Sequence, residues 1–240
     1  EAAREIARFG FGVEAWYDPN MAPELAEALR AAPAVSVHAT GSWVKDWMAK
    51  TGRSRFDAYR MQLDDIAAFN CRTLVLHASH IIVKGSDHEL DVELASFMVE
   101  YGRELGIAIA LENTLEEQGL SYAWEADAIA QVDGLNICLD TGHVYWTDHA
   151  LADYLGALKH RLVHMHVQDI ACELESPITE IYGLDHLNPG SGGISRDDWR
   201  LLLDTLEEID FDGMAVFEVR PRHPLQLGLQ AREFMQSMQR

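Results

Sequence analysis

Short apolar segments of strand length alternate with segments of helical pattern along almost the whole chain of 240 residues. Seven segments have the length and apolar character of buried strands: 11–16, 34–38, 72–77, 107–112, 135–140, 162–167 and 213–219. Strands that are buried on both faces and joined by helices form parallel sheets. The spacing of these segments fits strand–helix–strand units of about 30 residues or more. The alternation therefore predicts a parallel α/β fold.

The segments between these strands have the three-four periodicity of helices that cover a core. They are residues 1–9, 23–31, 55–69, 89–105, 123–132, 150–158, 196–209 and 225–238. Gly10 and Gly106 are expected to end two of these helices, because glycine tolerates the left-handed backbone conformation that is common there. Residues 40–53, which are rich in Trp and Gly, and the polar residues 172–194 are predicted to be loops.

Polar residues end nearly every predicted strand, which favours a closed (β/α)8 TIM barrel over an open doubly wound sheet. A barrel gathers its functional residues at the carboxyl ends of many strands, whereas an open sheet collects its ligand at one switch point. Only seven strands are visible, and the helix at 1–9 has no strand before it. The first barrel strand is therefore expected upstream of Glu1. Residues 1–240 are predicted to form a single domain.

The missing strand would leave unpaired edges at 11–16 and 213–219, and such edges invite pairing with another chain. Closure is therefore expected either by residues upstream of Glu1 or by a partner chain, and a homo-oligomer is one expected outcome. If the barrel is open instead, Glu218 is expected to be less firmly placed than Glu112 and Asp140, because its strand borders the gap.

The formal net charge of −20 disfavours nucleic acids and anionic membranes as partners. Nucleic acids bind through clusters of Lys and Arg, but the chain has only four lysines and no basic run. We therefore expect neither a nucleic acid nor an anionic membrane as partner. No apolar run approaches the length of a membrane span. The three cysteines, Cys71, Cys138 and Cys172, are widely spaced and odd in number, which favours a reducing cytoplasm over a disulfide framework.

Four strand ends carry residues that can bind a metal: Glu112, Asp140, His166 and Glu218. In a barrel these ends converge on one axial point, where three carboxylates would repel one another unless a cation neutralised them. Carboxylate oxygens together with an imidazole suit Mn, Co, Mg or Zn. The alternative for any single carboxylate is a pair with an arginine or a cap on the following helix.

The other histidines fall into two groups. His38 and His77 end neighbouring strands, and His143 lies three residues after Asp140. Each of these can be a second metal ligand, a group that hydrogen-bonds the substrate, or a satisfied core residue. His164 is expected to face the surrounding helices and to be structural. Surface roles are expected for the remaining group: His80, His88, His149, His160 and His223.

Other catalytic patterns do not fit. No glycine-rich dinucleotide or Walker loop follows a predicted strand, and the Gly-rich stretch at 190–193 lacks the lysine of a Walker loop. No lysine lies at an inner strand position, which disfavours Schiff-base chemistry. The strand-end carboxylates and histidines are therefore the main candidates for a site.

In this order, the strand-end residues resemble the xylose-isomerase-like superfamily of TIM barrels, which includes sugar isomerases and epimerases and metal-dependent abasic-site endonucleases. The matching pieces are residues 12–14, 37–38, 76–77, 111–113, 139–143 (Leu-Asp-Thr-Gly-His), 164–169 (His-Met-His-Val-Gln-Asp), 186–190 and 217–218. The resemblance implies that Glu112, Asp140, His166 and Glu218 are shared metal ligands. In the epimerase branch, the two equivalent glutamates also exchange protons with the substrate.

The nuclease branch offers a second set of matches. His38 and His77 correspond to histidines that hold a further metal there, and His143 and His186 correspond to two of the three ligands of another. The third ligand would be an aspartate two residues before His186, where this chain has Leu184, with Asp185 displaced by one position. This departure and the acidic charge make DNA repair the second choice.

The sequence therefore predicts a divalent-metal-dependent isomerase or epimerase that acts on a small sugar, sugar phosphate or cyclitol through an enediolate. Glu112 and Glu218 are the predicted catalytic residues. The predicted substrate-binding residues are His38, His77, His143, His186, Trp16 and Arg220, with Trp43 and Trp146 as further apolar walls. A lyase reaction from the same enolate also stays open. The alternatives are an abasic-site endonuclease and a sugar-binding barrel without catalysis.

Overall fold

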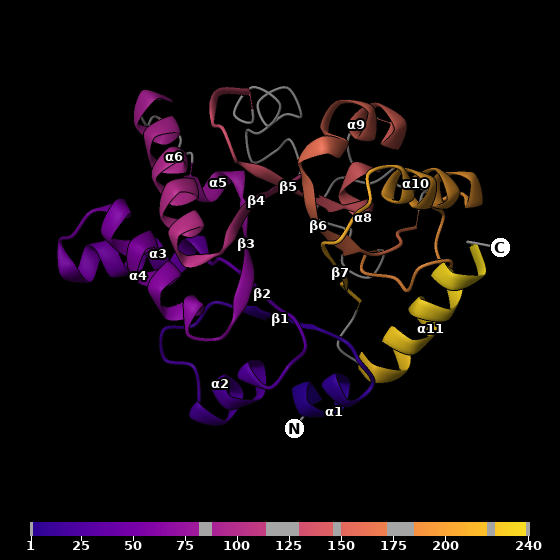
Figure 1. Cartoon of the computed structure of the whole chain (residues 1–240), viewed down its shortest axis with the longest axis horizontal. Helices are drawn as coiled ribbons and strands as arrows, with labels where there is room; N and C mark the ends of the chain where they lie inside the picture. The colour runs from indigo at the N-terminus through magenta and orange to yellow at the C-terminus, as the bar shows by residue number, and fades with distance from the viewer. Residues whose placement is uncertain are drawn as a thin grey trace. The chain divides into compact units, whose positions relative to one another are not determined.

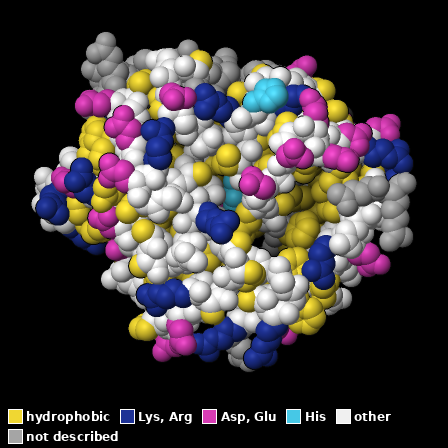
Figure 2. Space-filling model, in the orientation of Figure 1, with side chains coloured by type: hydrophobic (Ala, Val, Ile, Leu, Met, Phe, Trp, Pro, Cys, Tyr) yellow, Lys and Arg dark blue, Asp and Glu magenta, His cyan; other side chains and the backbone are white. Residues whose placement is uncertain are grey.

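The computed structural model describes residues 2–81, 88–113, 130–145, 150–171, 185–219 and 224–238. They fall into two compact units, Glu1–Cys138 and Leu139–Arg240. Among the described residues, none of the helices has both the length and the apolar character needed to cross a bilayer. On the face drawn in Figure 2, basic side chains lie singly or in small groups among acidic ones rather than in one continuous patch.

The first unit is built on parallel strands that are hydrogen-bonded in chain order. They are β1 (Val13–Trp16), β2 (Val35–His38), β3 (Cys71–His77), β4 (Ala108–Glu112) and the first three residues of β5 (Asn136–Asp140). All four residues of β2 are buried, as expected for a strand covered on both faces. The register pairs Trp16 with His38, and His77 with Glu112. These four side chains therefore lie at the carboxyl edge of the sheet.

Six helices of the first unit are described: α1 (Ala2–Arg8), α2 (Pro23–Arg30), α3 (Gly41–Thr51), α4 (Arg55–Ala67), α5 (Ala78–Ile81) and α6 (His88–Leu105). A capping box between Ser54 and Asp57 starts α4, and Gly106, with φ 73°, follows the end of α6. Figure 1 shows α4 and α6 side by side outside β3 and β4, which they contact. Leu63, Ile66 and Leu94 are fully buried in this layer.

The second unit contains the end of β5, β6 (Leu162–Val167) and β7 (Met214–Phe217), and β6 pairs in parallel with β7. Its helices are α8 (Thr141–Val144), α9 (Leu151–Leu158), the short 3-10 helix η2 (Lys159–Arg161), α10 (Arg196–Glu208) and α11 (Pro224–Met238). Ser195 caps α10 by accepting the Asp198 N–H. Trp199 of α10 packs edge-on against Phe234 of α11, with ring centroids 5.8 Å apart.

The predicted alternation is confirmed: all seven predicted strands are present, and a helix precedes the first of them. The prediction of a loop at 40–53 is wrong, because α3 occupies most of it. Gly52 adopts the left-handed conformation at φ 69° and ends that helix, a role that the Gly- and Trp-rich sequence obscured. Most of the predicted helix at 123–132 and most of the predicted loop at 172–194 lie outside the described residues. The single domain over 1–240 stays a prediction.

Candidate functional site

Three side chains at the ends of neighbouring strands meet in the first unit. Glu112 Oε2 lies 2.8 Å from His38 Nε2 and 3.1 Å from His77 Nε2. His38 and Glu112 are buried, and His77 is partly exposed. Each of the three offers a ligand atom within 4.8 Å of the others. We call this set the His–His–Glu cluster.

Both ring nitrogens of His38 face oxygen acceptors. Nδ1 lies 2.9 Å from the carbonyl oxygen of Ala39, opposite the Glu112 carboxylate at Nε2. If the His38 ring is neutral and its Nδ1–H donates to that carbonyl, Nε2 carries a lone pair. This lone pair then faces the Glu112 carboxylate, which is also electron-rich. That approach is favourable only when a proton or a cation is shared there. Metal-binding histidines commonly donate their second N–H to a backbone carbonyl, so this geometry fits a ligand role for His38.

Aromatic rings surround the His–His–Glu cluster. The Trp16 ring lies 4.1 Å from the His38 ring, and the His80 ring stacks on His77 with centroids 5.0 Å apart. Burial, followed by the nearby His77 and His38, lowers the pKa of His80 to about 3, which keeps it neutral. The surface role expected for His80 is wrong, because α5 follows β3 directly and brings residue i+3 back beside His77.

Asp140 is a firmly held carboxylate at a strand end of the second unit. It is fully buried; its Oδ1 accepts the backbone N–H of His143 at 2.8 Å, and its Oδ2 accepts the Gln168 amide at 2.7 Å. Asp140 therefore does cap α8, the alternative role that the sequence left open. The imidazole of His143 lies farther away, with Nδ1 3.7 Å from Oδ2.

Glu218 directly follows β7, and its N–H donates to the Val167 carbonyl at 3.2 Å, which extends the pairing with β6 by one residue. Its carboxylate oxygens lie 3.4 Å from His166 Nδ1 and 3.5 Å from His186 Nε2. The hydrogen bond with Glu218 is the main cause that raises the pKa of His186. Asp140, His166 and Glu218 offer ligand atoms within 4.8 Å of one another. We call these three the Asp–His–Glu group.

Two residues after β6 hold this region together, and sequence analysis gave them no role. Gln168 bonds Asp140 through its amide N–H, and its oxygen accepts the His186 backbone N–H at 2.7 Å. Asp169 is buried and accepts backbone N–H groups of Ile170, Gly190, Gly192 and Ile194 at 2.9 to 3.1 Å. In the sequence, the feature that could have indicated these roles is that Gln168 and Asp169 are polar and directly follow a buried strand.

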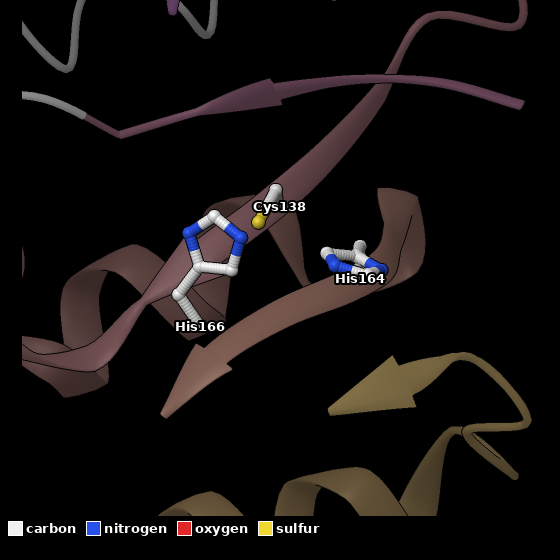
Figure 3. Close-up of side chains that lie close together, drawn as sticks. All are labelled: Cys138, His164 and His166. Atoms are coloured by element: carbon white, nitrogen blue, oxygen red, sulfur yellow. The ribbon is translucent and has the colours of Figure 1, made fainter. Parts of the chain in front are cut away.

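His164 lies beside His166, and not among the helices. Residues two apart on a strand share a face, and the rings of His164 and His166 meet edge-on with centroids 5.5 Å apart. Figure 3 shows both imidazoles on the same side of β6. The prediction that His164 faces the helices is therefore wrong, while its burial agrees with a structural role.

The remaining predicted residues divide by placement. Trp16 is 58 % exposed beside His38, whereas Trp43 packs edge-on against Tyr17 at 4.8 Å. Arg220 and Trp146 lie outside the described residues. Carboxylate oxygens and imidazole nitrogens in the Asp–His–Glu group and in the His–His–Glu cluster fit a divalent ion such as Mn, Co, Mg or Zn.

The chain matches one protein family in sequence and several solved structures in fold. A family model described as xylose isomerase-like TIM barrel matches residues 4–239. A D-psicose 3-epimerase from Clostridium cellulolyticum H10, solved with D-tagatose, superposes with a TM-score of 0.71 at 15% identity, covering 99% of this chain and 92% of its own. An AP endonuclease of family 2 from Brucella melitensis gives a TM-score of 0.66 at 18% identity, covering 95% and 90%.

A third solved structure is a protein from Thermus thermophilus soaked with ZnCl2. It has a TM-score of 0.61 and 22% identity, and covers 98% of this chain and 91% of its own. At these identities, the likenesses show the fold alone. A comparison with curated proteins gave no match.

Proposed function

The chain belongs to the xylose isomerase-like TIM-barrel family, and on this premise we propose that it is a divalent-metal-dependent isomerase or epimerase of a small polyhydroxy carbonyl compound. A D-psicose 3-epimerase and a D-tagatose 3-epimerase-like protein are among the solved structures with the same fold. The predicted alternation of strands and helices, the (β/α)8 class and the resemblance all agree with the family.

The proposed metal ligands are Glu112, Asp140, His166 and Glu218. The observation that carries this proposal is the Asp–His–Glu group, whose ligand atoms lie within 4.8 Å of one another in the second unit. Glu112 joins the set on the grounds of sequence, because it ends a neighbouring strand in the family pattern. When bound, the ion would polarise the substrate carbonyl and so acidify the adjacent C–H bond.

The two glutamates are proposed to move the proton. One carboxylate removes it from the carbon next to the carbonyl, which leaves an enediolate on the substrate, and the other glutamate supplies a proton in return. Return to the neighbouring carbon gives an isomer, and return to the opposite face of the same carbon gives an epimer. His186, beside Glu218, and His143, beside Asp140, are proposed to hydrogen-bond substrate hydroxyls.

The test is turnover of a small set of ketoses by the purified protein. After chelation, the protein is supplied with Mn or Co and incubated with D-fructose, D-psicose or D-tagatose, and the products are separated by chromatography. We expect conversion of a ketose only with metal. Equal conversion in the chelated protein would contradict the proposal.

The second candidate is an abasic-site endonuclease, and the His–His–Glu cluster is the observation that favours it. In the nuclease branch, the two matching histidines hold a further metal, and His38 and His77 lie against Glu112 as such a site would require. One departure from the nuclease pattern argues against this candidate. The pattern needs an aspartate at position 184, where this chain has Leu184; Asp185 follows it, with its carboxylate 3.0 Å from His186 Nδ1. Specific incision of an abasic duplex at physiological salt would favour this candidate over the sugar enzyme.

A sugar-binding barrel without catalysis is the third interpretation, and the ketose assay separates it too. Such a protein would bind metal and sugar without converting any ketose. The cytoplasmic location and the homo-oligomer expected from the sequence stay predictions.

A further inference from the structure

A large cavity lies in the first unit beside the His–His–Glu cluster. Its volume is about 950 Å³, at the upper end of the range of small-molecule sites. Helix α3 forms one wall, and Trp16, Ala39 and His80 form the side toward the strand ends. Because His80 stacks on His77 and Trp16 lies against His38, the cavity adjoins the cluster directly.

The closeness of α3 to the cluster depends on Gly41. A Cβ atom at this position would come within 2.5 Å of His80 Cδ2, so the start of α3 can approach the imidazole only as glycine. The cavity and the cluster are therefore neighbouring parts of one surface of the first unit, and one ligand can reach both.

The walls of the cavity are mainly apolar. Val44, Met48 and Ala49 of α3 face it, together with the indole of Trp16. Trp16 is 58 % exposed, the highest value among the large apolar side chains that are exposed in the described chain. Pockets that bind small molecules are lined mainly by apolar and aromatic side chains of this kind. A bare sugar, which carries a hydroxyl on nearly every carbon, would leave most of this surface uncovered.

The charged side chains that line the cavity are basic, although the chain as a whole is acidic. The chain has 39 Asp and Glu residues but only 19 Lys and Arg, yet the described lining holds two cations, Lys45 and Arg55, and no carboxylate. Arg55 is already engaged, with the Ile81 carbonyl at 2.6 Å and Asp91 at 3.0 Å. Within the described part of the chain, Lys45 makes no ion pair. Lys45 is therefore the cation that a ligand can use.

We propose that this cavity binds an apolar group that carries a negative charge, with Lys45 as its counter-ion and Trp16, Val44 and Met48 as its walls. On the basis of the proposed function, this group is the part of the substrate remote from the reacting carbons. The preferred substrate is then a polyhydroxy compound with an apolar, anionic substituent, and an unsubstituted ketose is a poorer substrate of the same site.

The test uses two probes of matched shape, 3-phenylpropanoate and 3-phenylpropanamide, titrated into the whole chain in a calorimeter at low salt. Both should bind saturably, and the acid should bind about threefold more tightly, the size of one exposed ion pair. Inorganic phosphate, which has charge but no apolar part, should show no saturable binding. Phenyl phosphate should bind like the acid if the cavity accepts any apolar anion, and no better than the amide if it is selective for carboxylates.

Variants on α3 locate the site. Lys45→Met should remove the preference for the acid over the amide, whereas Lys50→Met, on the same helix but outside the lining, should keep it. Ala49→Asp, at an exposed lining position, should weaken the acid more than the amide. Thermal unfolding shows whether each variant is folded.

Three results would overturn the proposal: no saturable binding of either phenyl compound, an acid preference unchanged in Lys45→Met, or phosphate binding as tightly as the acid. The titration needs neither metal nor turnover. Failure of the ketose assay would therefore contradict the proposed reaction but not this binding site. Failure of the titration would contradict the binding site but not the proposed reaction.

Discussion

The two units hold their strand-end carboxylates in different ways. In the first, Glu112 is 2 % exposed and is gripped by two imidazoles at 2.8 and 3.1 Å. In the second, Glu218 is 28 % exposed, and its imidazole contacts are longer, at 3.4 and 3.5 Å. Asp140 resembles Glu112 in its burial but is held by an amide and a backbone N–H. The second unit thus combines one rigid carboxylate with one accessible carboxylate.

This difference indicates that the two kinds of carboxylate have different roles in the proposed reaction. A buried carboxylate with short contacts is already oriented to act as a metal ligand or as a proton acceptor. No reorganisation free energy is therefore needed when the substrate binds. An accessible carboxylate can reach a substrate that enters from solvent. The expectation that Glu218 is less firmly placed than Glu112 if the barrel is open stays a prediction.

Removal of either glutamate should have the largest effect. Glu112→Gln and Glu218→Gln keep the shape of the side chain but lose its basicity and its negative charge, so ketose conversion should fall by about a thousandfold in each. Circular dichroism should show an unchanged fold, since barrel stability resides in the apolar layers. Full activity in either variant would remove that glutamate from the mechanism.

Loss of His38 should cost more stability than loss of His77. The His38 side chain is 3 % exposed and that of His77 is 24 % exposed. His38→Ala leaves a buried carboxylate with one partner fewer, at a cost of about 3 kcal/mol in the free energy of unfolding. For His77→Ala we expect about 1 kcal/mol. Urea denaturation in the presence of a chelator measures both, and the reverse order would contradict the description of the cluster.

In the second unit, Asp169→Asn should loosen the segment that carries His186. The substitution replaces one carboxylate oxygen by an amide nitrogen, which cannot accept, so one pair of backbone N–H groups loses its acceptor at a cost of about 2 kcal/mol. Amide hydrogen exchange at Gly190, Gly192 and Ile194 should accelerate. Exchange in α4, in the first unit, is the internal control and should stay unchanged; if it accelerates as much, the effect is global.

The smallest effect concerns two matched helix caps, one in each unit. Ser54 at the start of α4 and Ser195 at the start of α10 each accept the backbone N–H of the third residue after them. Each serine-to-alanine change should cost about 1 kcal/mol. If the units unfold together, both changes lower the same urea midpoint; two separate transitions, each shifted by one variant, would show that the units unfold independently.

Sequence patterns predicted the strands well because apolar runs and their polar ends depend on local composition. They also brought His38, His77 and Glu112 to neighbouring strand ends, where the structure places them in contact. They failed for α3, whose helix signal was masked by its aromatic and glycine residues. The roles of His80 and Gln168 were missed because they depend on which residue lies opposite after folding, and no local period encodes that.

The central claim, metal-dependent proton exchange at a substrate carbon, is tested most directly by solvent deuterium. A ketose is incubated with the protein in D2O, with Mn or Co and again after chelation, and its C–H signals are followed by NMR. We predict that deuterium enters the carbon next to the carbonyl only with metal, and that exchange is lost in Glu112→Gln and Glu218→Gln. Epimer or isomer formed without any deuterium entry from solvent, or exchange unaffected by chelation, would contradict the account.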